Sequence, residues 1–115
     1  MKFYNAYTKR WGVEPEGLGT SSSYMAVQVL KDAIERAGSL DPDAIVAELK
    51  KTDRKGVMGR VRYDEGNQAI YGTDPSENAI GLVFQWTEDG QRKIVFPASV
   101  AEAKIKLPPG LKSLK

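Results

Sequence analysis

The spacing of apolar residues along this chain changes once, at Gly56, and this change limits the folds open to it. Before Gly56, apolar residues recur every three or four positions, which is typical of amphipathic helices. After it, apolar and polar residues alternate from Val57 to Tyr63, which is typical of a strand. The order therefore predicts an α+β fold in which three helices are followed by a small, mostly antiparallel sheet.

The helical part contains clear start and stop signals. Aromatic residues at a spacing of four predict a helix over 1–11, which Gly12 would end. Residues 12–21 are rich in glycine and proline and are expected to form a linker. Residues 22–55 are then expected to form a helical pair that Gly38 divides. Since 115 residues suffice for one small domain, we treat 1–115 as a single domain or as a fragment of a larger one.

Within the pair, the first helix is expected at 22–37, with serines at its start as caps, and the second at 42–51. Asp41 followed by Pro42 is typical of a cap and a first helical position. The helical spacing predicts a buried stripe on the first helix made of Ala26, Val27, Leu30, Ala33, Ile34 and Ala37.

The strand and hairpin region is expected at 56–97. Turn residues at 64–67 predict a hairpin between the strand at 57–63 and a second one near 69–71. A long strand at 80–86 is expected to be covered on both faces, because most of its residues are apolar. Residues 98–115, which contain a Pro-Pro-Gly sequence, are expected to form a tail.

The composition argues against several classes of function. The chain contains no cysteine and no histidine, and we expect no catalytic residue, no metal site and no cofactor. A net charge of +2 does not indicate nucleic acid as the main partner. The basic stretch at 50–62 leaves nucleic-acid binding open as an alternative, although a helix end also favours cations. No apolar run is long enough to span a membrane, so membrane insertion is not expected.

Six segments in the same order carry a resemblance to a known family. They are FYNAY at 3–7, SYMAVQVLKDAIERAG at 23–38, LDPDAI at 40–45, GVMG at 56–59, YDEG at 63–66 and FQW at 84–86. Together they resemble the C-terminal third of the leucine/isoleucine/valine-binding type of periplasmic solute-binding protein. The resemblance covers nearly the whole chain and implies a partial type I periplasmic-binding-protein fold.

The resemblance also implies a function. Proteins of this family have two α/β lobes that close on a small ligand, often a branched-chain amino acid, and deliver it to the permease of an ABC transporter. Gly19, Thr20 and Ser21 match a crossing segment that contributes to the ligand cleft, and Tyr24 follows it at the head of a helix. Taken as residues alone, Gly19 also fits a flexible linker and Tyr24 also fits helix packing.

The family's central parallel strands have no counterpart in this sequence, which leaves apolar faces to be covered. Each large apolar side chain that stays exposed to water forgoes on the order of 1.5 to 3 kcal/mol. We therefore expect a homo-oligomer, either a homodimer or copies that exchange structural elements. The function expected from the resemblance is that of a C-terminal fragment of a substrate-binding protein that does not bind ligand by itself. The alternative is a self-standing oligomerisation or regulatory module. A full-length exported form would be periplasmic; residues 1–7 do not resemble a signal peptide, so a cytoplasmic location is also open.

Overall fold

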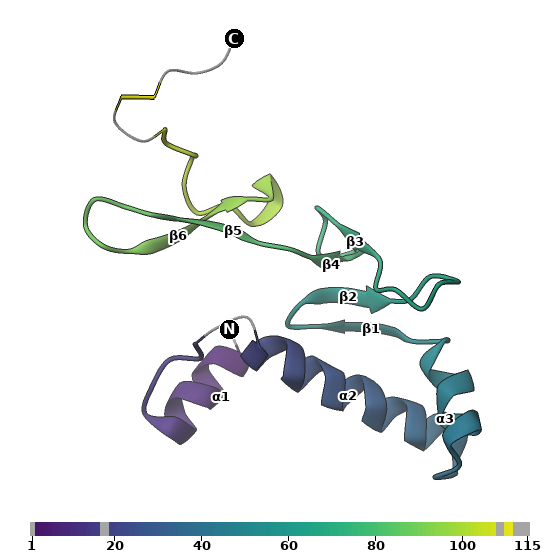
Figure 1. Cartoon of the computed structure of the whole chain (residues 1–115). Helices are drawn as coiled ribbons and strands as arrows, with labels where there is room; N and C mark the ends of the chain where they lie inside the picture. Colours follow the sequence, from purple (N-terminus) through teal and green to yellow (C-terminus); the bar gives the residue numbers. More distant parts are fainter. Residues whose placement is uncertain (1, 17–18, 108–109, 112–115) are drawn as a thin grey trace.

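A computed structural model describes residues 2–16, 19–107 and 110–111 (Figure 1). It confirms the α+β class, with three helices followed by short strands. The elements are α1 (Lys2–Trp11), α2 (Gly19–Ala37), α3 (Pro42–Leu49), β1 (Asp53–Gly56), β2 (Gly59–Arg62), β3 (Tyr71–Gly72), β4 (Ala79–Ile80), β5 (Val83–Trp86), β6 (Arg92–Phe96) and a 3₁₀ turn, η1 (Ala98–Val100).

The helix ends follow the local signals in the sequence. Gly12 has φ +72°, and its amide donates to the carbonyl of Thr8 at 2.9 Å. Gly38 has φ +59° and ends α2 in the same way. At the start of α3, the Asp41 carboxylate accepts a hydrogen bond from the Ala44 amide at 2.9 Å. Each signal is a left-handed glycine or a side-chain cap, so it acts without tertiary contacts.

The start of α2 differs from the expected boundary at residue 22. The helix begins at Gly19, so the expected 12–21 linker is shorter, and its residues 17 and 18 lie outside the described part. The serines therefore lie inside the helix, near its start, instead of preceding it. The Thr20 hydroxyl donates to the Glu16 carbonyl at 2.6 Å, and this bond holds the incoming chain against the helix. At the other end of the pair, α3 stops at Leu49, two residues earlier than expected.

The strands form two sheets. The first has the order β1-β2-β4-β3, with β3 and β4 parallel and the other pairs antiparallel, and the second is the antiparallel pair β5-β6. The expected turn at 64–67 is present, and an isolated bridge joins Tyr63 to Ala69. However, the main hairpin partner of β2 is β1, a segment that had been placed in the helical pair. Its sequence Asp-Arg-Lys-Gly has no apolar alternation, so periodicity gave no strand signal.

The expected long strand at 80–86 is interrupted. Gly81 and Leu82 separate β4 from β5, and the two strands belong to different sheets. In Figure 1 the β5-β6 hairpin extends away from the helices. Its side chains are accordingly less covered than expected, and Trp86 is 71% exposed. The prediction that both faces of this strand are covered is wrong for the chain by itself.

The core lies between α2 and the first sheet. Met25 and Val29 of α2 are buried against Val61 and Ala79, and Leu49, Met58 and Tyr63 pack around them. The buried line on α2 is thus Met25, Val29 and Ala33, whereas Val27 is 63% and Leu30 45% exposed. Of the six residues in the predicted stripe, Ala33 is buried and Ile34 and Ala37 are half-buried, but the other three are exposed. Apolar residues surround more than half of the helix, so spacing alone did not identify the face that contacts the sheet.

The molecule is extended. Its radius of gyration is 17.8 Å, with overall dimensions of 58 × 40 × 19 Å. A compact domain of this length has a radius of gyration of about 13 Å. The accessible surface of 8992 Å² exceeds the value for a compact monomer of this mass by roughly 2,800 Å². Much apolar surface that a globular domain would bury therefore faces solvent. Among the described residues, no helix has the length and apolar character needed to cross a membrane.

Candidate functional site

Two hollows lie near the N-terminal end of α2, and Val57 in the β1-β2 turn lines both of them. We call the first the aromatic pocket. It has a volume of about 380 Å³ and is lined by Lys2, Phe3, Tyr24, Met25, Gln28, Arg54, Lys55, Gly56 and Val57. We call the second the joint cleft. It has a volume of about 530 Å³ and is lined by Ser21, Ser22, Val57, Met58, Tyr71, Ile80, Gly81, Leu82, Phe84 and Arg92.

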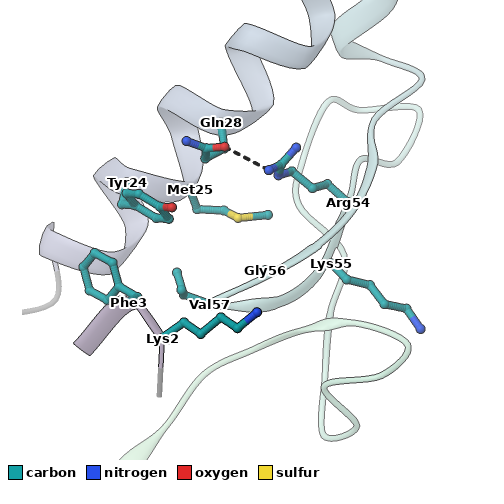
Figure 2. Close-up of a pocket in the computed structure, with 9 residues that line it drawn as sticks. All are labelled: Lys2, Phe3, Tyr24, Met25, Gln28, Arg54, Lys55, Gly56 and Val57. Carbon is teal, nitrogen blue, oxygen red and sulfur yellow. Dashed lines mark hydrogen bonds between the residues drawn. The ribbon is translucent and has the colours of Figure 1, made fainter. Parts of the chain in front are cut away.

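The aromatic pocket is built where α1 meets α2 (Figure 2). The rings of Phe3 and Tyr24 lie 4.9 Å apart with a tilt of 41°, a geometry that is favourable for aromatic pairs. Tyr24 remains 46% exposed, so this contact leaves part of its ring open to the pocket. In Figure 2 the ammonium group of Lys55 points away from the other side chains. The contact between the Phe3 ring of α1 and the Tyr24 ring of α2 therefore explains the position of Tyr24 as helix packing.

The far wall of the aromatic pocket is fixed by Arg54 and Gly56 of β1. The guanidinium of Arg54 donates to the Gln28 side-chain oxygen at 2.9 Å and also forms an ion pair with Asp32. A side-chain carbon at Gly56 would lie 2.4 Å from the Met25 sulfur, so glycine here lets the flexible Met25 side chain pack against the strand without shifting. These contacts neutralise Arg54 and give it a structural role.

The joint cleft lies where the two sheets meet. The first turn of α2 contributes Ser21 and Ser22, the β1-β2 turn contributes Val57 and Met58, and the remaining lining comes from Tyr71, the junction at 80–82 and the second hairpin. The guanidinium of Arg92 lies over the Phe84 ring, 5.0 Å from its centroid. The cleft thus combines apolar walls with three hydroxyl-bearing residues and one cation, a pattern typical of small-molecule sites.

The four predicted site residues do not line one common hollow. Ser21 lines the joint cleft and Tyr24 the aromatic pocket, whereas Gly19 and Thr20 line none of the hollows described here. Their role in ligand binding stays a prediction. Sequence reasoning did not identify Tyr71, Phe84 and Arg92 as lining residues, because no motif links positions this far apart.

The basic stretch at 50–62 is largely engaged within the chain. Arg60 forms a two-bond ion pair with Asp53, with nitrogen–oxygen distances of 2.6 and 2.7 Å, and lies 3.1 Å from a carboxylate oxygen of Glu77. The Arg60 guanidinium lowers the pKa of the Asp53 carboxyl below its usual value. Further pairs join Lys51 to Glu48 and Arg54 to Asp32. These cations serve intramolecular contacts, although nucleic-acid binding itself stays untested. No cluster of potential metal ligands occurs in the part of the chain that the structure describes.

Comparisons with known proteins place this geometry in context. A family profile described as "Periplasmic binding protein" matches residues 1–91. The chain is 28% identical over 111 residues to the Leu/Ile/Val-binding protein homolog 7 of Brucella melitensis, a match that covers 93% of this chain and 26% of that protein. It is 25% identical over 109 residues to homolog 8 of Brucella abortus, covering 91% of this chain and 25% of that protein.

One solved structure has a similar fold. It is described as the crystal structure of a "putative branched-chain amino acid ABC transporter" from Silicibacter pomeroyi, and it superimposes with a TM-score of 0.80 at 21% sequence identity. The match covers 94% of this chain and 30% of that chain. The present chain therefore spans about a quarter of the length of its curated relatives and less than a third of the solved structure.

Proposed function

Because the chain belongs to the periplasmic binding protein family, we propose that it is the C-terminal part of the substrate-binding protein of an ABC transporter. The observation that carries this proposal is the family match over residues 1–91. The names of the two Brucella relatives support leucine, isoleucine, valine or related small solutes as ligands of the full-length protein. Its partners would then be that solute and the transporter permease, and its location the periplasm.

By itself, the chain is not expected to hold such a ligand tightly. It spans 26% of the length of the first relative, and Tyr24 and Trp86 are largely exposed. A ligand bound beside these residues would keep much of its surface in contact with solvent. A closed binding site, by contrast, buries most of the surface of a small ligand. Solute-binding proteins bind and release their ligands unchanged, so no catalytic activity is proposed.

Calorimetry of the 115-residue chain against leucine, isoleucine and valine tests the binding part of this proposal. We expect no binding tighter than the millimolar range, and submicromolar affinity for any of the three would contradict it. Sequencing the DNA upstream of Met1 tests the fragment part. An in-frame signal peptide and N-terminal lobe would support it, whereas a separate ribosome-binding site with no such frame would overturn it.

A second candidate function is a self-standing oligomerisation or regulatory module derived from the same family. The roughly 2,800 Å² of surface in excess of a compact monomer favours it, since obligate homodimers bury about 2,000–5,000 Å². In this case two copies would cover the exposed apolar residues of α2. Sedimentation of the chain at micromolar concentration tests this candidate, and a compact monomer would exclude it.

A further inference from the structure

The joint cleft has a charge that the predicted site residues do not supply. Arg92 is the charged member of its ten described lining residues, so the net charge of the lining is +1. None of the ion pairs between described residues involves Arg92. Its guanidinium lies over the Phe84 ring, and a stacked guanidinium keeps its N–H groups available at its edge. This group is therefore both oriented and available for an anion.

The other walls define the shape and polarity of the ligand. Val57, Met58, Ile80 and Leu82 present apolar surface, and the cleft volume of about 530 Å³ suits a small molecule. Tyr71 and Ser21, which both carry a hydroxyl group, line the same cleft, and Ser21 lies in the first turn of α2. Hydroxyl groups can donate to a carboxylate, and the positive end of a helix dipole favours one.

We propose that the joint cleft binds a small monocarboxylate with an apolar body, and that Arg92 is the residue that selects the carboxylate. This inference rests on the proposed function and narrows its solute class from the three amino acids to related solutes that lack an ammonium group. The ammonium group of an amino acid would be repelled by the +1 lining. A branched 2-oxo acid or a short branched fatty acid has the same apolar body without that group and therefore suits this cleft better than leucine does.

Nuclear magnetic resonance of the ¹⁵N-labelled 115-residue chain tests the proposal. Isovalerate, its neutral isostere isovaleramide and leucine would be titrated separately to millimolar concentrations. We expect isovalerate to shift the amide signals of Ser21, Leu82 and Phe84, with leucine and isovaleramide binding at least several times more weakly. Equal shifts from isovalerate and isovaleramide, or no shift at these residues, would overturn the proposal.

A matched pair of variants tests the role of Arg92. Arg92→Gln and Lys93→Gln remove the same charge from adjacent positions of β6, but Lys93 lines a different hollow. We expect Arg92→Gln to weaken isovalerate binding about fivefold, the upper range for an exposed ion pair, while Lys93→Gln leaves it unchanged. Arg92→Lys should restore part of the affinity. Equal effects of the two glutamine variants would refute a specific role for Arg92.

Independent measurements test the carboxylate site and the transporter assignment. The amide spectrum of each variant shows whether the fold is retained, so a folded variant that loses isovalerate binding reports on the cleft. The upstream reading frame is determined independently of any ligand. A signal peptide and N-terminal lobe upstream, combined with no isovalerate binding, would keep the transporter assignment and reject the carboxylate.

Discussion

Gly59 offers the sharpest test of the packing that holds both hollows in place. It is the first residue of β2, directly after the turn that contains Val57 and Met58. Its φ is +89°, and a side-chain carbon added here would lie 2.3 Å from the carbonyl oxygen of Asn78. That oxygen already accepts a hydrogen bond from the Arg60 amide at 3.0 Å. The clash is therefore with backbone held in the sheet, which cannot move without losing this bond.

The expected cost of Gly59→Ala has two parts. A left-handed backbone costs a non-glycine residue about 1–2 kcal/mol. Overpacking at a buried position adds about 1–3 kcal/mol. Gly38→Ala isolates the first part, because Gly38 has φ +59° and a carbon added there would meet nothing within 4 Å. We therefore expect Gly59→Ala to lower the free energy of unfolding by on the order of 2–5 kcal/mol, against about 1–2 kcal/mol for Gly38→Ala.

Urea unfolding followed by circular dichroism measures both values on the same chain. The comparison requires similar slopes of free energy against denaturant concentration, since a changed slope would indicate a different unfolding transition. If the two variants are destabilised equally, the steric contact with Asn78 is not what determines the residue at this position. In that case the inference that packing at Gly59 holds Val57 and Met58 in place beside the hollows would also be refuted.

Two further predictions concern the helices. Leu30→Glu places a charge on the exposed apolar side of α2; if two copies cover this side, the variant should dissociate at least tenfold more readily in sedimentation experiments, and an unchanged dimer would exclude this surface. Glu48 has a pKa held below its usual value, chiefly by a hydrogen bond from the Lys51 ammonium group. A depressed folded-state pKa gives stability that is present above the unfolded pKa and is lost as the pH falls through the folded value. Glu48→Gln should therefore lower stability at neutral pH and flatten its decline in acid, measured by urea unfolding at several pH values; an unchanged acid profile would contradict this.

The parts of the fold that follow local rules could be predicted from sequence. Gly12, Gly38 and Asp41 act within one helical turn, and the structure has them in the expected roles. The β1 strand could not be recognised, because it has no apolar side chain and the buried apolar residue of this hairpin, Val61, lies on its partner β2. Likewise, the buried face of α2 depends on where Val61 and Ala79 lie, which the spacing of residues along one helix does not reveal.

The candidate site was less accessible to sequence reasoning than the fold. Ser21 and Tyr24 were selected through the family resemblance; they lie about one turn apart on α2 but line different hollows. Arg92 lies in a strand whose sequence carries no binding motif. It becomes a candidate only because the second hairpin, which follows the break at Gly81 and Leu82, lines the same cleft as the first turn of α2. Tertiary geometry, which single-sequence patterns do not specify, determines this arrangement.

The polar sequence of β1 also bears on how this chain can associate without aggregating. β1 is an outer strand of its sheet, and it carries Asp53, Arg54 and Lys55 in succession. Charged residues on an open strand discourage pairing with the strands of other molecules, which is the route to fibrils. A chain with this much exposed apolar surface would otherwise be a strong candidate for amyloid-like growth. The charges on β1 therefore disfavour the addition of strand after strand at this edge of the sheet. Association through side chains, which can stop at a small number of copies, remains open to the chain.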